Sequence, residues 1–454
     1  MMLGQLEIGG VMESTAVRAG AVLLAIALLV VLAREVRNIP ARLFALMGTA
    51  FLDMVGVLMV IPLLPFYIQR LGGEGLNFSL LGVPFHMGIG LITAFMVSAF
   101  TVAQLVSAPI WGRFSDKFGR RPALLVALTA SAIAYLVFGF ANTLFLLLLS
   151  RLVQGAGGGT VGVIQAYVAD AVEPSQRAKS LGWLSAATNL GVALGPVVGA
   201  FAVTLGQAGV DRGMPTALGH AMPGLLAAAL CASAAVFAWR FLPESREEHH
   251  PSVVRKTSRQ ALLRVISHSG EPASRLIWIY AITMGAFNGV TAVLALFLAY
   301  RFQVTEKTIG YFFMYVGAIS VFTRVLLLGK AVDKFGEARL SRFGMVLLAI
   351  GLGGMPLVSS LAGLAFFVAL IPLGTAFTFP CVTGLLSRVI SNHERGLYMG
   401  LQQTYGGVAR VVAPIWAGFA FDRLGLGVPF YTSAIVVLAT ISLGLGLDQY
   451  ARRE

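Results

Sequence analysis

Long apolar runs separated by short polar segments recur along this chain from residue 43 to residue 447. Runs of about 20 apolar residues have the length of a helix that crosses a ~30 Å hydrocarbon core. The pattern predicts an all-α polytopic membrane protein. We expect twelve spans, at 43–68, 88–111, 122–140, 143–169, 180–204, 222–242, 274–300, 308–328, 339–359, 362–387, 397–421 and 427–447.

Composition agrees with a chain that lies in the bilayer. Hydrophobic residues make up 57% of it and charged residues 12%, whereas soluble proteins carry about twice as much charge. With these spans, 24 of the 33 Lys and Arg residues fall on one side, six on the other and three inside the membrane. Such an excess marks the cytoplasmic side, so the net charge of +13 reports topology rather than nucleic-acid binding. We therefore expect a plasma-membrane protein, in bacteria one of the inner membrane, with a cytoplasmic C-terminus.

The long polar stretch 243–273 divides the spans into six and six. It predicts an N-terminal bundle at 43–242, a cytoplasmic linker at 243–273, a C-terminal bundle at 274–447 and a tail at 448–454. Residues 1–42 form an extension in which 16–33 are apolar enough for an accessory helix. The cysteines Cys231 and Cys381 both lie inside predicted spans, where we expect them to pack as small apolar residues.

The two halves resemble each other in sequence. The basic loop 112–121 (GRFSDKFGRR) has a weaker copy at 329–336 (GKAVDKFG), 217 positions later. Segment 177–182 and Pro196 correspond to 395–400 and Pro414 at an offset of 218. These matches imply a duplicated membrane fold. Parallel repeats of this kind place a substrate site at their interface, near the bilayer midplane.

Four segments carry a resemblance to a known family. The loop between spans 2 and 3 contains Gly112, Asp116, Gly119, Arg120 and Arg121. Span 4 reads RLVQGAGG from Arg151, and span 1 has Phe51-Leu52-Asp53 followed by Pro62 and Pro65. Span 5 contains Gly182, Gly191, Gly195, Pro196 and Gly199, with Ala200 in place of a final glycine.

Over residues 43–447 the chain resembles the major facilitator superfamily, and within it the twelve-span drug:proton antiporters that include tetracycline efflux proteins. The resemblance implies two six-helix bundles related by a pseudo-two-fold axis, working by alternating access. It also implies that Gly112, Asp116, Gly119, Arg120, Arg121 and Asp333 form a conformational latch. A basic loop that only sets topology is the alternative for these residues. The second copy departs from the pattern, with Glu337 and Ala338 in place of two basic residues.

Charged residues inside the first-half spans predict the chemistry of coupling. Asp53 is the carboxylate deep within these spans, and Arg151 lies in span 4 near Gln154. Burial favours the protonated form of a carboxyl group, and a nearby arginine favours the ionised form. We expect Asp53 to carry a proton, with Arg151 and Gln154 adjusting its affinity. A hydrogen-bonded structural aspartate and an arginine that snorkels to the helix end are the alternatives.

Further polar residues predict a substrate cavity. On span 4, Arg151, Gln154, Gly158 and Gln165 recur at helical spacing and predict one polar stripe along a wet cavity. In the second half, Asn288, Arg324, Gln403 and Arg410 lie inside predicted spans. The two arginines suit an anionic group on a substrate, although binding to backbone carbonyls would also explain them. Gly191, Gly195, Pro196 and Gly199 predict a packing and hinge element on span 5.

The sequence contains no Gly-x4-Gly-Lys-Ser/Thr phosphate loop and no arrangement typical of an enzyme. We therefore expect a secondary transporter without a cofactor, whose partners are the lipid bilayer, protons and a small-molecule substrate, and which acts as a monomer. Proton-coupled export of amphipathic compounds is the first interpretation. A carrier of a specific anionic metabolite and a non-transporting sensor or scaffold are the alternatives.

Overall fold

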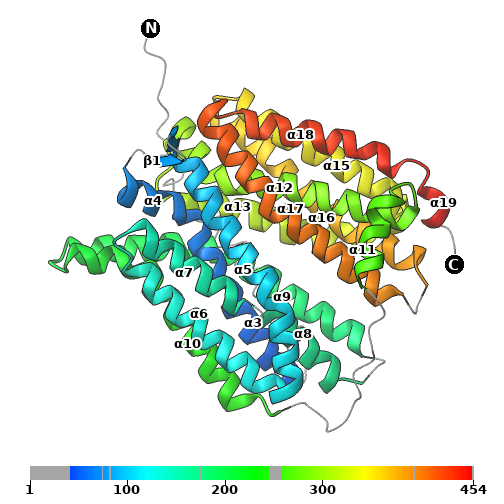
Figure 1. Cartoon of the computed structure of the whole chain (residues 1–454), viewed down its shortest axis with the longest axis horizontal. Helices are drawn as coiled ribbons and strands as arrows, with labels where there is room; N and C mark the ends of the chain where they lie inside the picture. The colour runs from blue at the N-terminus through cyan, green and yellow to red at the C-terminus, as the bar shows by residue number, and fades with distance from the viewer. Residues whose placement is uncertain are drawn as a thin grey trace. The chain divides into compact units, whose positions relative to one another are not determined.

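The computed structural model describes residues 41–73, 75–80, 83–158, 160–173, 176–244, 258–391 and 394–451. The accessory helix expected at 16–33 and most of the polar linker lie outside these residues. Every one of the twelve predicted spans coincides with helix, which confirms the all-α prediction (Figure 1).

The first six predicted spans correspond to α3 and α4 together, α5, α6, α7 and α8 together, α9 and α10. Their bounds are α3 Ala41–Val60, α4 Leu64–Gly72, α5 Ile89–Phe118, α6 Arg120–Gly139, α7 Leu144–Gly157, α8 Thr160–Ala171, α9 Arg177–Val210 and α10 Thr216–Phe241. Between α3 and α4 the chain forms a short 3₁₀ turn at Ile61–Leu63. Pro62 lies in this turn, and its missing N–H cannot serve an α-helical hydrogen bond.

The last six correspond to α12, α13 and α14 together, α15, α16, α17 and α18. Their bounds are α12 Pro272–Phe302, α13 Ile309–Phe322, α14 Leu328–Phe335, α15 Glu337–Gly354, α16 Leu361–Val389, α17 Arg395–Arg423 and α18 Val428–Thr440. A π-helical stretch, Thr323–Leu327, joins α13 to α14. The linker contains a helix of its own, α11 (Ser258–Ser267), and a short helix, α19 (Asp448–Ala451), follows α18.

Within the described residues, ten helical stretches are long and apolar enough to cross a membrane. Val428–Gly444 is a shorter apolar helix. Helix α17 is not among the ten; its sequence includes Arg395, Gln402, Gln403, Arg410 and Asp422. Polar side chains on a spanning helix are expected where it faces protein or a wet cavity rather than lipid.

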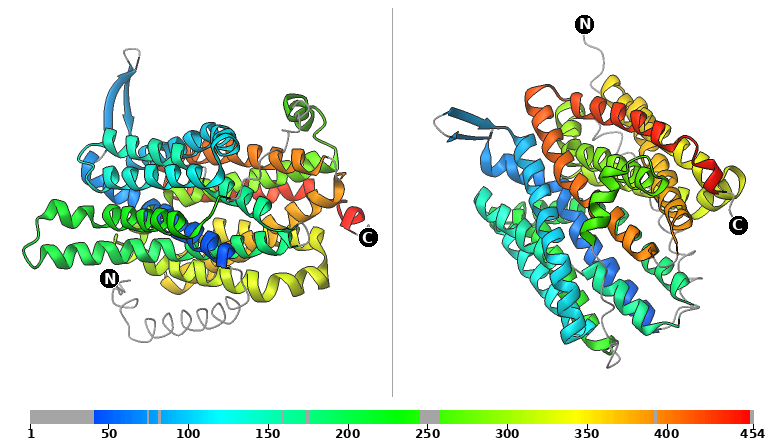
Figure 2. Two further views of the ribbon diagram at one scale, coloured as in Figure 1. Left: turned by 90° about the horizontal axis from the view of Figure 1, so that it is seen from below. Right: turned by 45° about the vertical axis from the view of Figure 1, so that its right-hand side comes forward.

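A small β-hairpin precedes α5, which the sequence pattern did not predict. Strands β1 (Leu76–Leu80) and β2 (Val83–Met87) pair with each other, and Figure 2 shows them standing clear of the helix ends. The Nδ1 atom of His86 lies 2.7 Å from the Oδ1 atom of Asn77 across the hairpin. The hairpin places Gly88 and Gly90 at the start of α5.

The connection between spans 2 and 3 is tighter than the expected basic loop. Residues 112–118 continue α5, and Gly119 alone separates α5 from α6. In the second copy, Gly336 alone separates α14 from α15. Both glycines have positive φ, +105° and +75°, a conformation that glycine adopts without steric cost. The repeated motif is therefore a helix–glycine–helix corner.

The chain divides into two compact units. Unit 1 comprises Met1–Leu76, Val102–His249 and Ala295–Ala318, and unit 2 comprises Asn77–Thr101, His250–Leu294 and Ile319–Glu454. These boundaries run through α5, α12 and α13 rather than through the linker alone. In unit 1, α3 packs against α9 and α10, and α6 packs against α7 and α10; in unit 2, α15 packs against α16 and α18. The bundles at 43–242 and 274–447 stay a prediction drawn from the repeat.

Candidate functional site

A buried carboxylate lies at the centre of unit 1. The side chain of Asp53 on α3 is 2% exposed, and its Oδ2 atom accepts a hydrogen bond of 2.6 Å from the Thr160 hydroxyl. Thr160 is the first residue of α8. The start of α8 therefore supplies the hydroxyl that contacts Asp53. Outside such pairing, a carboxylate in a membrane interior is expensive, which makes Asp53 a candidate for function.

A buried cation lies on the neighbouring helix α7. Arg151 is 2% exposed, and its guanidinium carbon is 5.0 Å from the centroid of the Phe138 ring on α6. Its Nε and Nη2 atoms are buried and have no hydrogen-bond partner. This burial rules out an arginine that snorkels to the helix end. A guanidinium held over an aromatic face, with donors unused, is available for a partner that arrives during a reaction cycle.

Tyr135 connects the two charged residues. Its hydroxyl accepts a short hydrogen bond from the Gln154 Nε2 atom, and Gln154 is itself 1% exposed. The hydroxyl interacts electrostatically with both Asp53 and Arg151. Among the described residues, Asp53 and Arg151 form no ion pair with each other. The structure therefore brings Asp53, Arg151, Gln154 and Tyr135 into one buried cluster in which the two charged residues are not directly paired.

Small residues make room for this cluster. A Cβ atom on Gly56 of α3 would lie 3.3 Å from the Tyr135 ring and 3.4 Å from the Cys231 sulfur. Cys231 is fully buried and unpaired, as is Cys381 in a separate apolar cluster of unit 2 with Leu340. Both cysteines pack as small apolar residues, as the sequence predicted.

The residues of the polar stripe expected along span 4 differ in burial. Helix α7 ends at Gly157 and α8 begins at Thr160. Arg151 and Gln154 are buried, whereas Gln165 is exposed. Gln165 thus lies outside the buried cluster.

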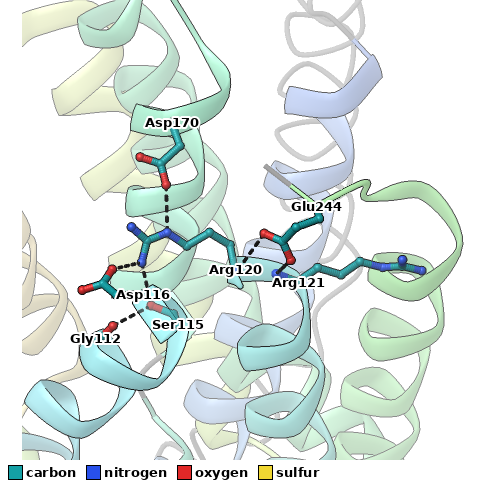
Figure 3. A network of polar contacts seen from close by, with 7 residues as sticks. All are labelled: Gly112, Ser115, Asp116, Arg120, Arg121, Asp170 and Glu244. Carbon is teal, nitrogen blue, oxygen red and sulfur yellow. Dashed lines mark hydrogen bonds and ion pairs between the residues drawn. The ribbon is translucent and has the colours of Figure 1, made fainter. Parts of the chain in front are cut away.

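The corner at Gly119 carries a network of charged residues from four segments (Figure 3). Arg120 donates to Asp116 (2.6 Å), to the Ser115 hydroxyl (2.7 Å) and, through Nε, to Asp170 of α8 (2.8 Å). Glu244, beyond the end of α10, accepts from the backbone N–H groups of Arg120 (2.8 Å) and Arg121 (3.1 Å). Carboxylates at a helix N-terminus are favoured by the unsatisfied N–H groups and the helix dipole.

The carboxylates of this network have different roles. Glu244 accepts from the backbone N–H groups at the start of α6, whereas Asp116 binds the Arg120 side chain. A Cβ atom on Gly112 would meet nothing within 4 Å, so Gly112 does not serve close packing. Neither Asp170 nor Glu244 belongs to the repeated motif, and only the fold brings them to it.

The second copy of the corner is built differently. Asp333 lies exposed on α14, and Arg121 has no basic counterpart there because Ala338 occupies that position. Glu337, at the position that matches Arg120, is 3.3 Å from the Arg388 Nη2 atom of α16. The carboxylate and the arginine have exchanged places between the copies, so the asymmetry seen in sequence extends to the contacts.

The glycines of span 5 pack α9 closely against α3. A Cβ atom on Gly191 would lie 2.7 Å from the Phe51 carbonyl oxygen, and one on Gly195 would lie 2.7 Å from the Leu58 Cβ atom. Gly199 likewise faces the backbone of Met59. These contacts are the ones that Gly-x3-Gly spacing permits. Pro196 lies inside this helix, and its role as a hinge stays a prediction.

The second-half residues of the expected cavity lie on three elements of unit 2. Asn288 of α12 donates to the Met284 carbonyl at 2.9 Å, and Gln403 of α17 donates to the Tyr280 hydroxyl at 3.4 Å. Arg410 is half-buried on α17. Arg324 lies in the π-helical stretch Thr323–Leu327, a distortion that is frequent at functional sites.

A contact that the sequence reading missed joins α5 to α17, which belong to different halves of the sequence. The Asp422 carboxylate accepts from the backbone N–H groups of Gly90 (3.0 Å) and Leu91 (2.8 Å), and Arg423 donates to the His86 carbonyl (2.9 Å). A Cβ atom on Gly90 would lie 2.6 Å from the Asp422 Oδ1 atom. We call Gly88, Gly90, Leu91, Asp422 and Arg423 the Asp422 clasp. The Gly-x-Gly sequence at the start of span 2 is the signal that could have indicated it.

The arrangement of helices matches that of known transporters. A bacterial homologue of the human lysosomal transporter Spinster superposes with a TM-score of 0.68 at 13% identity, covering 91% of this chain and 97% of that one. The human organic anion transporter MFSD10 (TETRAN) superposes with a TM-score of 0.64 at 23% identity, covering 89% and 99%. These likenesses confirm the fold.

Sequence comparisons identify the family. The chain is 26% identical over 406 residues to multidrug resistance protein 2 of Bacillus subtilis, covering 88% of this chain and 93% of that protein. It is 25% identical over 408 residues to the class B tetracycline resistance protein of Escherichia coli, covering 86% and 94%. The family model of the Major Facilitator Superfamily matches residues 46–414 and 276–452. The chain therefore belongs to the Major Facilitator Superfamily and is a membrane transporter rather than an enzyme.

Proposed function

We propose that this transporter exports small amphipathic organic compounds in exchange for protons. The observation that carries the proposal is the buried cluster of Asp53, Thr160, Tyr135, Arg151 and Gln154 in unit 1. An ionisable group in the membrane interior is expensive and is kept where it serves transport. Asp53 is the proton carrier in this proposal.

The cluster has the parts that proton exchange needs. Thr160, the first residue of α8, supplies one hydroxyl to Asp53, and a rearrangement at the start of α8 would remove or restore it. Arg151 has unused donors on two guanidinium nitrogens. When Asp53 is ionised, movement of Arg151 toward it would stabilise the carboxylate, and movement away would favour its proton. One conformational change can thereby load and release a proton.

Two sets of contacts are suited to alternating access. The network at Gly119 lies at the end of α5 that we expect on the cytoplasmic side, and the Asp422 clasp lies at its other end. Both rest on charged groups and backbone amides, which can exchange their partners for water at moderate cost. In this proposal the clasp is intact in one state and open in the other.

The direction and class of substrate rest on relatives. Two relatives, which are 26% and 25% identical to this chain, are named multidrug resistance protein and tetracycline resistance protein. Their names indicate removal of organic compounds from cells. A carrier of organic anions is the second candidate, favoured by Arg324 and Arg410 in the second half and by the likeness to MFSD10.

Reconstitution into vesicles tests the proposal. Vesicles with an acidic lumen are expected to accumulate ethidium, a permanently charged dye that a pH gradient cannot trap by itself. A protonophore should abolish the accumulation. Uptake of carboxyfluorescein without need of a pH gradient would instead support the anion carrier. Ethidium uptake that is the same with and without the pH gradient would contradict proton exchange.

A further inference from the structure

A groove lies within unit 2, whereas the buried cluster of Asp53 belongs to unit 1. It has a volume of about 550 Å³ and is formed by α12, α17 and α18, with α11 at one end. Small residues give it depth, among them Ala281 and Gly285 on α12 and Ala409 and Ala413 on α17. Among the described residues, no charged side chain lines it.

The lining offers very little to a polar ligand. The Thr404 hydroxyl donates to the Gly400 carbonyl (2.9 Å), and the Thr432 hydroxyl donates to the Val428 carbonyl (2.9 Å). Both are therefore turned to the backbone of their own helices. Most of the remaining lining is aliphatic or aromatic. A ligand that such a groove suits is apolar along its length, as an alkyl chain is, because it gains dispersion contacts with the lining.

The rim of the groove faces the bilayer. Val408 and Val412 on α17 are 54% and 59% exposed, and Val436 on α18 is 45% exposed. Large apolar side chains that are exposed along membrane helices meet hydrocarbon rather than water. The groove thus opens to the acyl chains of the surrounding lipid.

Helix α11 bounds one end of the groove and has an apolar and a charged face. The Trp278 Nε1 atom donates to the Val265 carbonyl (3.3 Å), and the Tyr405 hydroxyl donates to the Leu262 carbonyl (2.9 Å), which holds α11 against α12 and α17. Ile266 lines the groove and is 59% exposed, whereas Arg264 on another face of α11 pairs with Glu271 at 3.0 Å. An amphipathic helix of this kind lies in the membrane interface. Figure 1 shows α11 beside α17.

We propose that this groove binds one acyl chain of a membrane phospholipid, whose headgroup lies beside α11. The lipid then fills the space between α12, α17 and α18 that side chains leave open. It also connects the polar linker, through α11, to the second half of the transporter. The proposal does not depend on the identity of the exported substrate or on proton coupling.

Tryptophan quenching by a brominated phospholipid tests the proposal, because bromine quenches only at close range. Trp278 and Trp416 line the groove, and the chain's other tryptophans are Trp111, Trp183 and Trp239. Replacing those three with Phe leaves the two groove residues as reporters. The full-length chain is then placed in bilayers that contain phosphatidylcholine with brominated acyl chains.

The decisive variant fills the groove from α18. Ser433→Phe adds a ring at a lining position, and Ile435→Phe on the same helix is the matched control because Ile435 is 64% exposed and does not line the groove. We expect Ser433→Phe to lower the quenching about twofold, since the ring displaces the chain from a fixed volume. Ile435→Phe should leave it unchanged. Equal quenching in all three proteins, or an equal fall in both variants, would overturn the proposal.

A second variant covers the case in which Ser433→Phe does not fold. Val436→Phe adds its ring at the exposed rim of the groove, where no packed core has to yield. Mass spectrometry of the intact protein in detergent gives an independent count of retained phospholipid. The parent protein should retain one phospholipid more than Val436→Phe. Equal counts would contradict a bound chain.

Discussion

At the scale of single residues, Arg151 in unit 1 is expected to lower the stability of the fold and to serve transport. Arg151 keeps two buried nitrogens without hydrogen-bond partners. Each such group costs about 1–3 kcal/mol in the folded state. A protein that retains this cost is expected to use the residue in its working cycle.

The first prediction concerns Arg151→Met, which keeps much of the side-chain volume and removes the charge. We expect the variant to unfold at a higher temperature than the parent protein, because an unsatisfied buried cation has been removed. We expect it to lose dye accumulation. Thermal unfolding in detergent and vesicle transport measure the two effects. A variant that is less stable yet transports normally would show that Arg151 is structural.

The second prediction concerns Asp53→Asn, which keeps the shape and the contact with Thr160. Accumulation against a gradient under an acidic lumen should disappear, because the amide cannot carry a proton. Exchange of labelled for unlabelled dye at equal concentrations should persist. Asp211→Asn is the control, since Asp211 is exposed at the end of α9. Accumulation by Asp53→Asn would exclude this residue as the proton carrier.

At the scale of elements, α9 carries both a packed and an open glycine, which allows a matched comparison. A Cβ atom at Gly191 meets the backbone of α3, which cannot move aside, whereas one at Gly182 meets nothing within 4 Å. Replacing glycine with alanine is therefore expected to lower stability at one position of α9 and to raise it at the other.

The third prediction is that Gly191→Ala lowers stability by about 1–3 kcal/mol, the usual cost of overpacking. Gly182→Ala should raise stability by about 0.5–1 kcal/mol, because alanine favours the helix. Thermal unfolding of the two variants beside the parent protein measures the difference. A similar effect at both positions would mean that the α3–α9 contact yields more easily than the distances indicate.

At the scale of the whole molecule, the Asp422 clasp joins helices that come from different halves of the chain. An ionised carboxylate that accepts two backbone N–H groups is worth about 1.5–3 kcal/mol for each bond. This is enough to shift a balanced conformational equilibrium by more than tenfold. The clasp should therefore influence how often the start of α5 separates from the end of α17.

The fourth prediction is that Asp422→Asn favours the open clasp, because an amide offers one accepting oxygen and no charge. Spin labels at His86 and Leu426 should report a larger share of long distances. Asp448→Asn is the control, since Asp448 pairs with Arg342 at 2.9 Å, away from the clasp. Dye transport is expected to change in Asp422→Asn alone. An unchanged distance distribution would remove the clasp from the proposed cycle.

Much of the fold could be predicted from the chain because apolar length is a local property. A run of about 20 apolar residues is enough to identify each span. The local sequence around Gly119 and Gly336 likewise indicates two matching corners. Asp53, Arg151 and Gln154 could be selected for a similar reason, since charged and polar residues are conspicuous in apolar runs. The π-helical stretch Thr323–Leu327 could not, because no local pattern marks it within an apolar run.

The sequence by itself determined that the chain lies in a membrane and that segments of its first half recur in its second, and it predicts which side of the membrane is basic. Hydropathy, charge and sequence repeats can all be recognised from the order of residues along the chain. Only the tertiary structure decided that Gln154 binds Tyr135, that Glu244 binds the start of α6, and that Asp422 meets Gly90. These partners are more than 70 residues apart or on separate helices, and their pairing follows from how helices pack, which no local pattern encodes.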